Sequence, residues 1–134
     1  AMDNPFAARP GIARMLNGTP GILGLTAARC GIAVSADAGI LNIAMKARTL
    51  GSYAIDVAGE LGLTCSTARP PTSSGGHISI IHPDAATLQR RLADRKVIVD
   101  KRDPDVLRFG LSPLTTRFVD VHDGLSALAG MLDA

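Results

Sequence analysis

The feature that most constrains this chain is a short apolar strand that carries a positive charge. Residues from Val106 to Leu111 alternate as a β-strand does, so odd and even positions lie on opposite faces. The odd face is wholly apolar, with Leu107 and Phe109 at its centre, and is expected to be buried. Arg108 lies on the even face, where its charge costs free energy unless an anion meets it.

Two explanations of Arg108 follow from these residues, and both remain open at this point. Gly110 shares its face and has no side chain, so a ligand can approach the strand there, and a planar guanidinium suits bidentate binding of a carboxylate. The alternative is a structural arginine on a solvent-exposed sheet face that pairs with Asp100 or Asp103.

The remaining chain predicts an α+β fold, with a small and mostly antiparallel sheet covered by helices on one face. An extended N-terminal arm, 1–19, is expected to precede a single domain, 20–134. The following elements are predicted from periodicity and from capping or turn residues: helices at 20–33, 37–61, 84–95 and 115–132; strands at 63–66, 77–82, 97–100 and 106–111; and a loop at 68–76. Ser35 or Asp37 is the expected cap of the second helix, and Gly62 its C-terminal glycine.

Composition excludes several classes of function. With 46% hydrophobic and 3% aromatic residues, the chain is expected to be globular with an aliphatic core. A net charge of +2 from scattered basic residues does not predict a nucleic-acid interface. No signal peptide or membrane span is recognised, and Cys30 and Cys65 are expected to be buried free thiols, so a cytoplasmic location is expected.

The helix predicted at 20–33 is apolar on nearly all sides. Such a helix must be buried on all sides, and so short a chain cannot cover it alone. Self-association as a homodimer, or docking on a partner chain, is therefore expected.

The helix start at Asn17-Gly18-Thr19-Pro20 offers a second candidate site. Backbone N–H groups at Gly18 and Thr19, the Thr19 hydroxyl and the positive end of the helix dipole together suit a phosphate group. The alternative is an ordinary N-cap at Thr19 with Pro20 as the first helical residue.

The sequence shows no catalytic machinery of its own. His77 and His82 are five residues apart on one predicted strand, so they point to opposite faces and cannot share a metal ion. The three lysines, Lys46, Lys96 and Lys101, lie in no motif that suggests a Schiff base, and Ser73-Ser74 lies in a loop with no motif around it.

Two blocks of sequence resemble the kynureninase family, which depends on pyridoxal phosphate (PLP). They are RPGIARMLNGTPGILGL at 9–25 and VIVDKRDPDVLRFGLSPLTTRFVDV at 97–121, with weaker similarity in SIIHPD at 79–84. The resemblance implies the C-terminal small domain of a fold-type-I PLP enzyme. It also implies that Arg108 binds the substrate's α-carboxylate, and that Thr19, with Gly18, reaches the PLP phosphate of a neighbouring subunit.

The departures from the family pattern limit what can be carried over. The family's large domain, with its Schiff-base lysine, has no counterpart in the sequence, so this chain alone is expected to be inactive and to bind no PLP. Gly21, Thr115-Thr116 and His122 replace residues usual in the family, which puts substrate choice in doubt.

Three alternatives for the chain's function remain. It is the C-terminal fragment of a kynureninase-like PLP-dependent hydrolase of tryptophan catabolism, inactive alone, whether truncated, split or excised; a non-catalytic assembly module; or a carboxylate-binding module. If the family's geometry is retained, the Arg108 guanidinium is expected to face an open concave surface lined by Gly110 and the turn at 112–116, and not to pair with Asp100 or Asp103.

Overall fold

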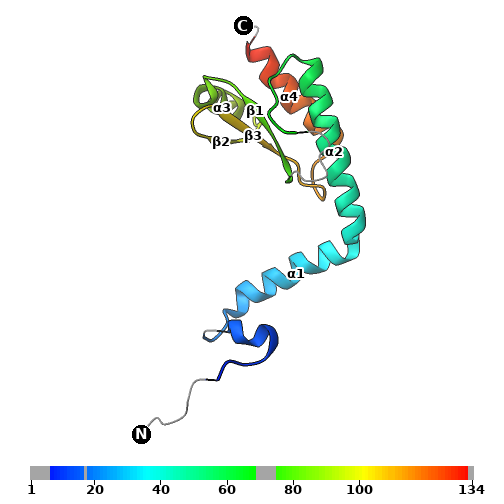
Figure 1. Ribbon diagram of the computed structural model, residues 1–134, viewed down its shortest axis with the longest axis vertical. Coiled ribbons are helices and arrows are strands. Elements are labelled where there is room, and N and C mark those ends of the chain that lie inside the picture. The colour runs from blue at the N-terminus through cyan, green and yellow to red at the C-terminus, as the bar shows by residue number, and fades with distance from the viewer. Residues whose placement is uncertain (1–6, 17, 69–74, 133–134) are drawn as a thin grey trace. The chain divides into compact units, whose positions relative to one another are not determined.

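The computed structural model describes residues 7–16, 18–68 and 75–132. The chain divides into two compact units, 1–37 and 38–134, which are described separately. The elements are, in order, η1 (Gly11–Met15), α1 (Ile22–Ala38), α2 (Ile40–Glu60), β1 (His77–Ile81), α3 (Ala85–Asp94), β2 (Asp100–Arg102), β3 (Val106–Gly110) and α4 (Phe118–Leu132), as Figure 1 shows. The predicted boundary at residue 19 stays a prediction.

A three-stranded antiparallel sheet in the order β1-β3-β2 forms the centre of the second unit. The register places Ile78 opposite Phe109 and Ile80 opposite Leu107, so four apolar side chains lie on the same face. All four are at least 92% buried. The alternation predicted for the strand at 106–111 is therefore confirmed, and the fold is α+β as expected.

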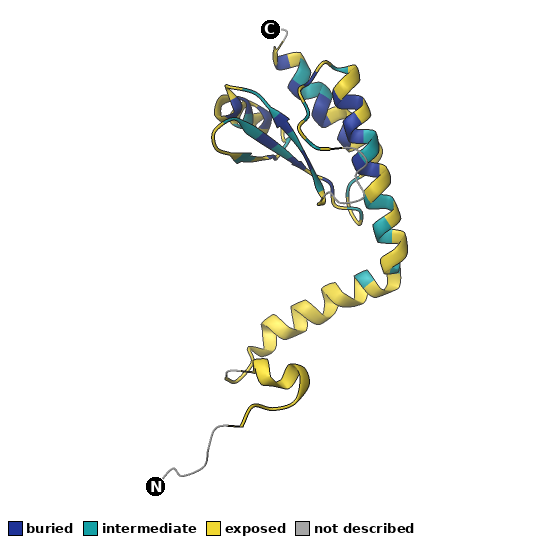
Figure 2. Cartoon of the chain, in the orientation of Figure 1, coloured by how far each residue is buried: buried dark blue, intermediate teal, exposed yellow. Residues whose placement is uncertain are grey.

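Helices α2, α3 and α4 cover this apolar face. α2 contacts α4 and β1, while α3 contacts β2, β3 and α4. The helices contribute fully buried aliphatic side chains to the core, among them Leu50, Leu92, Leu125 and Leu128. Figure 2 shows the buried residues on the sheet and on the helix surfaces that surround it. The opposite face of the sheet stays half-buried or exposed, which determines where a ligand can approach.

The start of α4 is fixed by its own side chains. Asp120 accepts a hydrogen bond of 2.8 Å from the backbone N–H of Arg117, three residues earlier, and its carboxylate pairs with the Arg117 guanidinium. These contacts from Arg117 lower the pKa of Asp120 to about 2. The helix therefore begins at Phe118 and not at residue 115.

The first unit contains α1, which buries no residue. The helix runs to Ala38, five residues beyond its predicted end, and includes both Ser35 and Asp37. Those residues therefore do not cap α2; Gly39, with φ of 79°, occupies that position. Cys30 is exposed on α1, so its predicted burial was wrong, whereas Cys65 is half-buried.

The predicted strand positions need two corrections. Cys65 forms only an isolated bridge with Ile80, so the segment 63–66 is not a full strand. The predicted strand at 97–100 begins instead at Asp100, because the Val97 N–H is bonded to the Leu92 carbonyl at the end of α3. Most of the predicted loop at 68–76 lies outside the described residues.

No single helix in the described ranges is long and apolar enough to cross a membrane. α1 and α2 meet the same requirements of length and composition only when they are taken together as a pair.

The ends of α2 and α3 show the same capping pattern with different residues. The Leu63 N–H bonds to the Ala58 carbonyl behind Gly62, and the Val97 N–H bonds to the Leu92 carbonyl behind Lys96. Gly62 has φ of 68°, as predicted for a helix-ending glycine, while Lys96 takes φ of 65°. A residue with a side chain is strained in this left-handed conformation, whereas glycine is not. The end of α3 at Lys96 therefore costs conformational free energy that the end of α2 at Gly62 does not.

We predict that Lys96→Gly stabilises the protein by about 0.5–1 kcal/mol, because it relieves the strain at φ of 65°. Gly62→Ala is the matched control and should destabilise the protein by about 1 kcal/mol. Urea unfolding of the three proteins measures both effects. A loss of stability in Lys96→Gly would contradict the capping assignment.

Candidate functional site

The open face of the sheet carries a groove of about 480 Å³ in the second unit. Seven residues line it: His77, Gln89, Ile98, Val99, Asp100, Arg108 and Gly110. They come from all three strands, from α3 and from the segment before β2. Because β3 is the central strand, Arg108 has a hydrogen-bonded neighbour strand on either side.

Arg108 pairs with Asp100 across the sheet. The register places Asp100 directly opposite Arg108, and its Oδ2 atom accepts hydrogen bonds from Nε at 3.0 Å and from Nη2. The expectation that Arg108 is free of an internal acid was therefore wrong, and the alternative of pairing with Asp100 is confirmed. The reason is the register itself, since side chains directly opposite each other have Cβ atoms roughly 5 Å apart. Asp103 pairs with Lys101 instead.

A second arginine shares the same carboxylate. Arg102 lies two residues beyond Asp100 on the same face of β2, and its Nε donates to Asp100 Oδ2 at 3.0 Å. Hydrogen bonding to Arg108, with the nearby charges of both arginines, lowers the pKa of Asp100 despite some desolvation. Asp100 is therefore ionised at neutral pH, and the three groups together carry one net positive charge.

The pair does not close the groove. The Arg108 side chain keeps 30% of its surface exposed and the Asp100 side chain keeps 49%. A Cβ atom built on Gly110 meets nothing within 4 Å, as expected for an open approach to the strand. The face can therefore accept a small anion beside Arg108, and the apolar side chain of Ile98, 80% exposed, lines the same groove.

Sequence reasoning missed two residues of this groove. Gln89, on α3, donates a hydrogen bond of 3.0 Å to the Val99 carbonyl, and no motif marked it. Ile98 was predicted to lie in a strand. It is exposed because residues 97–99 do not join the sheet, which the sequence did not predict. His77 was considered only as a metal ligand. In the described part of the chain, no three histidine, cysteine or acidic side chains are placed to hold a metal ion.

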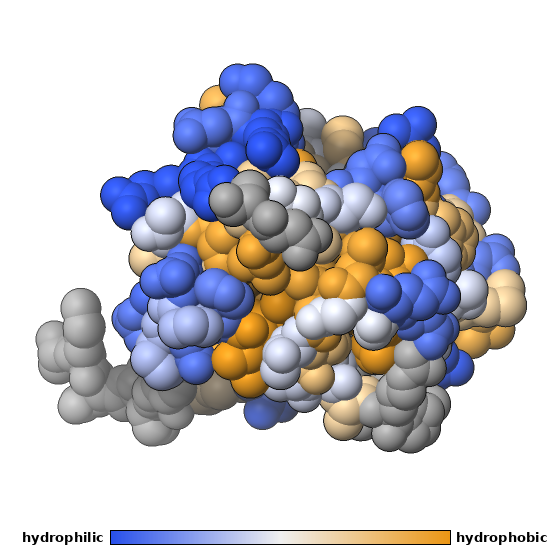
Figure 3. All heavy atoms as spheres, turned by 90° about the horizontal axis from the view of Figure 1, so that it is seen from above, coloured by the Kyte–Doolittle hydropathy of each residue, from blue (hydrophilic) through white to orange (hydrophobic). Residues whose placement is uncertain are grey.

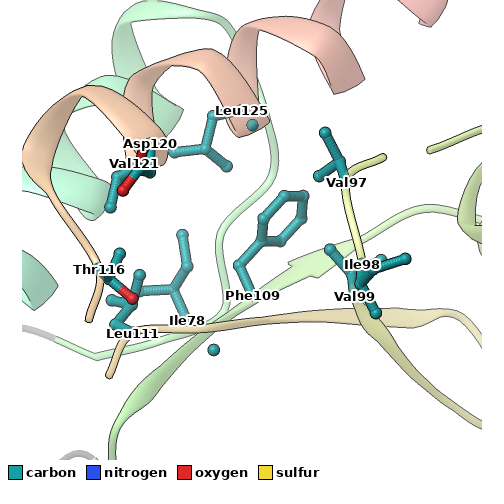
Figure 4. Close-up of a pocket in the computed structure, with 12 residues that line it drawn as sticks. Ile78, Val97, Ile98, Val99, Phe109, Leu111, Thr116, Asp120, Val121 and Leu125 are labelled. Carbon is teal, nitrogen blue, oxygen red and sulfur yellow. The ribbon is translucent and has the colours of Figure 1, made fainter. Parts of the chain in front are cut away.

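A smaller apolar pocket of about 180 Å³ lies between the sheet and α4. Figure 4 shows the Phe109 ring between Leu125 and the segment that carries Val97, with Thr116 and Asp120 at the other side. It shares Ile98, Val99 and Gly110 with the groove. Its lining is mostly aliphatic, so it offers shape but few polar groups to a ligand.

Gly18 and Thr19 lie in the first unit, whereas Arg108 lies in the second. Both are exposed and precede α1, whose first backbone bond runs from the Leu25 N–H to the Gly21 carbonyl at 3.0 Å. The cap position is therefore Gly21, so neither Thr19 as the N-cap nor Pro20 as the first helical residue is correct. A Cβ atom built on Gly18 meets nothing within 4 Å. The predicted place of Gly18 and Thr19 at the start of the helix was therefore wrong, and what they offer a phosphate oxygen is exposed backbone and the Thr19 hydroxyl. Asn17 lies outside the described residues.

Comparison with known proteins agrees with the resemblance seen in the sequence. The family model for the kynureninase C-terminal domain matches residues 43–128. The chain is 34% identical to the kynureninase of Pseudomonas fluorescens, and 37% identical to those of Burkholderia mallei (strain SAVP1) and Burkholderia pseudomallei (strain K96243). Each match covers 99% of this chain and 33% of the relative, so the chain spans about a third of the length of these relatives. Since the family model covers more than half of the chain, the chain belongs to the kynureninase family, through that family's C-terminal domain.

Proposed function

We propose that this chain forms the C-terminal part of a PLP-dependent hydrolase that acts on kynurenine, in tryptophan catabolism. The observation that carries the proposal is Arg108, a half-buried arginine in an open groove on the central strand of a kynureninase-family domain. In this proposal Arg108 binds the α-carboxylate of the substrate. The groove supplies a forked donor for the carboxylate and an apolar wall at Ile98 for the rest of the molecule.

Arg108 is suited to hold the substrate and not to react with it. A guanidinium stays protonated at any physiological pH, so its role is to fix the position and orientation of the carboxylate. Neighbouring strands hold its backbone on both sides and Asp100 contacts its side chain, which favours one bound geometry. The electron-sink chemistry that cleaves an amino-acid side chain is supplied by PLP when it is bound.

Gly18 and Thr19 are the residues proposed to hold the PLP phosphate of a neighbouring subunit. Their exposed backbone and the Thr19 hydroxyl can donate hydrogen bonds to that group. The Schiff base needs a lysine as well, and none of the described residues that line the Arg108 groove is a lysine. Lys101, the lysine of β2, is paired with Asp103. In this proposal residues 1–134 supply binding groups, and a large-domain partner supplies the lysine.

We predict that the chain of residues 1–134 does not cleave kynurenine, with or without added PLP, because none of the described residues that line the Arg108 groove is a lysine that could form the Schiff base. Anthranilate release, followed by fluorescence, is the measurement, and free PLP without protein gives the background rate. Turnover well above that background would contradict the prediction.

We predict that Arg108→Lys weakens binding of L-kynurenine to the chain about five- to tenfold, because lysine keeps the charge but loses the fork. Titration followed by amide NMR signals, with Gly110 as the reporter, measures the affinity. Arg102→Lys is the matched control, since Arg102 contacts Asp100 but does not line the groove. Equal affinity of Arg108→Lys and the unchanged chain would remove the basis of the proposed function.

A second candidate function, assembly, is favoured by α1. Its side chains Ile22, Leu23 and Ile32 are 79%, 87% and 69% exposed. Exposed apolar residues also occur in the second unit, and Figure 3 shows apolar residues gathered on one face between hydrophilic regions. Apolar surface of this kind is characteristic of protein interfaces, and two-fold dimers are the commonest outcome. We propose that the chain self-associates through α1.

We predict a dimer at micromolar concentration, and its loss in Leu23→Glu, because a buried glutamate without a partner is costly at an interface. Sedimentation velocity measures the state of assembly. Ser35→Glu adds the same charge to the same helix at a polar position and serves as the control. A clean monomer of the unchanged chain would exclude the assembly function.

A further inference from the structure

The pairing of β2 with β3 brings Arg108, Asp100 and Arg102 into one charge network. Asp100 lies opposite Arg108 in the register, and Arg102 follows it on the same face. A single atom, Asp100 Oδ2, accepts from Arg108 Nε at 3.0 Å, from Arg108 Nη2, and from Arg102 Nε at 3.0 Å. Asp100, which lines the groove, is thus held between two cations.

These contacts use only one edge of the Arg108 guanidinium. An arginine has five N–H donors, and Asp100 takes the Nε–H and one N–H of Nη2. One N–H of Nη1 and the second N–H of Nη2 form the other edge, and the remaining N–H of Nη1 points away from both edges. Two parallel donors on one edge are the arrangement that binds a carboxylate in a bidentate manner. Asp100 and an incoming carboxylate can therefore occupy different edges of the same guanidinium.

We propose that Asp100 is a positioning residue, which fixes Arg108 by its Nε edge and presents its Nη1–Nη2 edge to the carboxylate of the ligand. The proposal rests on the proposed function, in which Arg108 binds that carboxylate. Asp100 itself does not touch the ligand, and it remains bound to Arg108 when the ligand is present.

The charges favour this arrangement over one in which Asp100 competes with the ligand. Arg102 contributes a second positive charge to Asp100, so the network keeps one net positive charge for an anion. A free arginine side chain loses rotamer entropy when it is fixed. The contact with Asp100 meets much of that cost before the ligand arrives, which is the general advantage of preorganisation.

The test is a titration of the full chain with sodium acetate at constant ionic strength, followed by the Gly110 amide signal. Asp100→Ala removes the acceptor and should weaken acetate binding about threefold or more, because Arg108 is no longer fixed. Asp100→Asn keeps an acceptor oxygen and should retain the affinity within about twofold. Asp103→Ala removes the same charge next to β2 without touching Arg108, and should also retain it.

Three results would overturn the proposal or its basis. Tighter acetate binding in both Asp100 variants would show that Asp100 is a competitor. Unchanged binding in Asp100→Ala, together with weaker binding in Arg108→Lys, would show that Arg108 needs no positioning. Unchanged binding in Arg108→Lys would instead reject the carboxylate site itself, which separates failure of the proposed function from failure of this inference.

A readout on the unchanged chain makes the test independent of the variants' folding. The Arg108 Nε–H is bonded to Asp100, so its NMR signal should stay in place and remain protected from exchange when acetate is bound. Loss of that protection on acetate binding would show that Asp100 leaves Arg108, and would contradict the proposal.

Discussion

One-sided burial of the sheet is the constraint on which the candidate site depends. Ile78, Ile80, Leu107 and Phe109 are driven onto the core face by the hydrophobic effect, where three helices cover them. Because side chains alternate along a strand, this burial forces Arg108 onto the opposite face. The apolar residues beside it therefore set the face on which the arginine lies, and the central place of β3 holds its backbone between two strands. An anion site of this kind needs no loop to hold it.

The sequence predicted those parts of the fold that local periodicity controls. Alternation located β3, and the apolar spacing of α2 and its glycine at Gly62 located that helix and its end. Periodicity did not predict the start of β2, because Val97 is held by a bond to the end of α3, which only the folded chain brings about. The exposure of Cys30 was missed for a similar reason. An apolar helix was assumed to be buried, yet nothing in the described structure covers α1.

The candidate site was predicted only in part, because its central interaction depends on register. From spacing alone, Arg108 had to be either a ligand-binding or a paired residue, and the two seemed exclusive. In the proposal above the two roles are compatible, because Asp100 contacts the Nε–Nη2 edge of the guanidinium and leaves its Nη1–Nη2 edge for a ligand, and Arg102 offsets the charge of Asp100. A one-residue shift of β2 would have turned Asp100 to the core face. Groove residues such as Gln89 come from α3, and no sequence motif connects them to the strand.

The central claim is that the open sheet face of this kynureninase-family domain is a carboxylate site at Arg108. A crystal structure of the chain grown with acetate tests it most directly. The account predicts acetate on the Nη1–Nη2 edge of Arg108, beside Gly110, with Asp100 still bonded to Nε. A groove that remains without acetate at concentrations that saturate the solution titration, or an Arg108 side chain covered by protein, would contradict it.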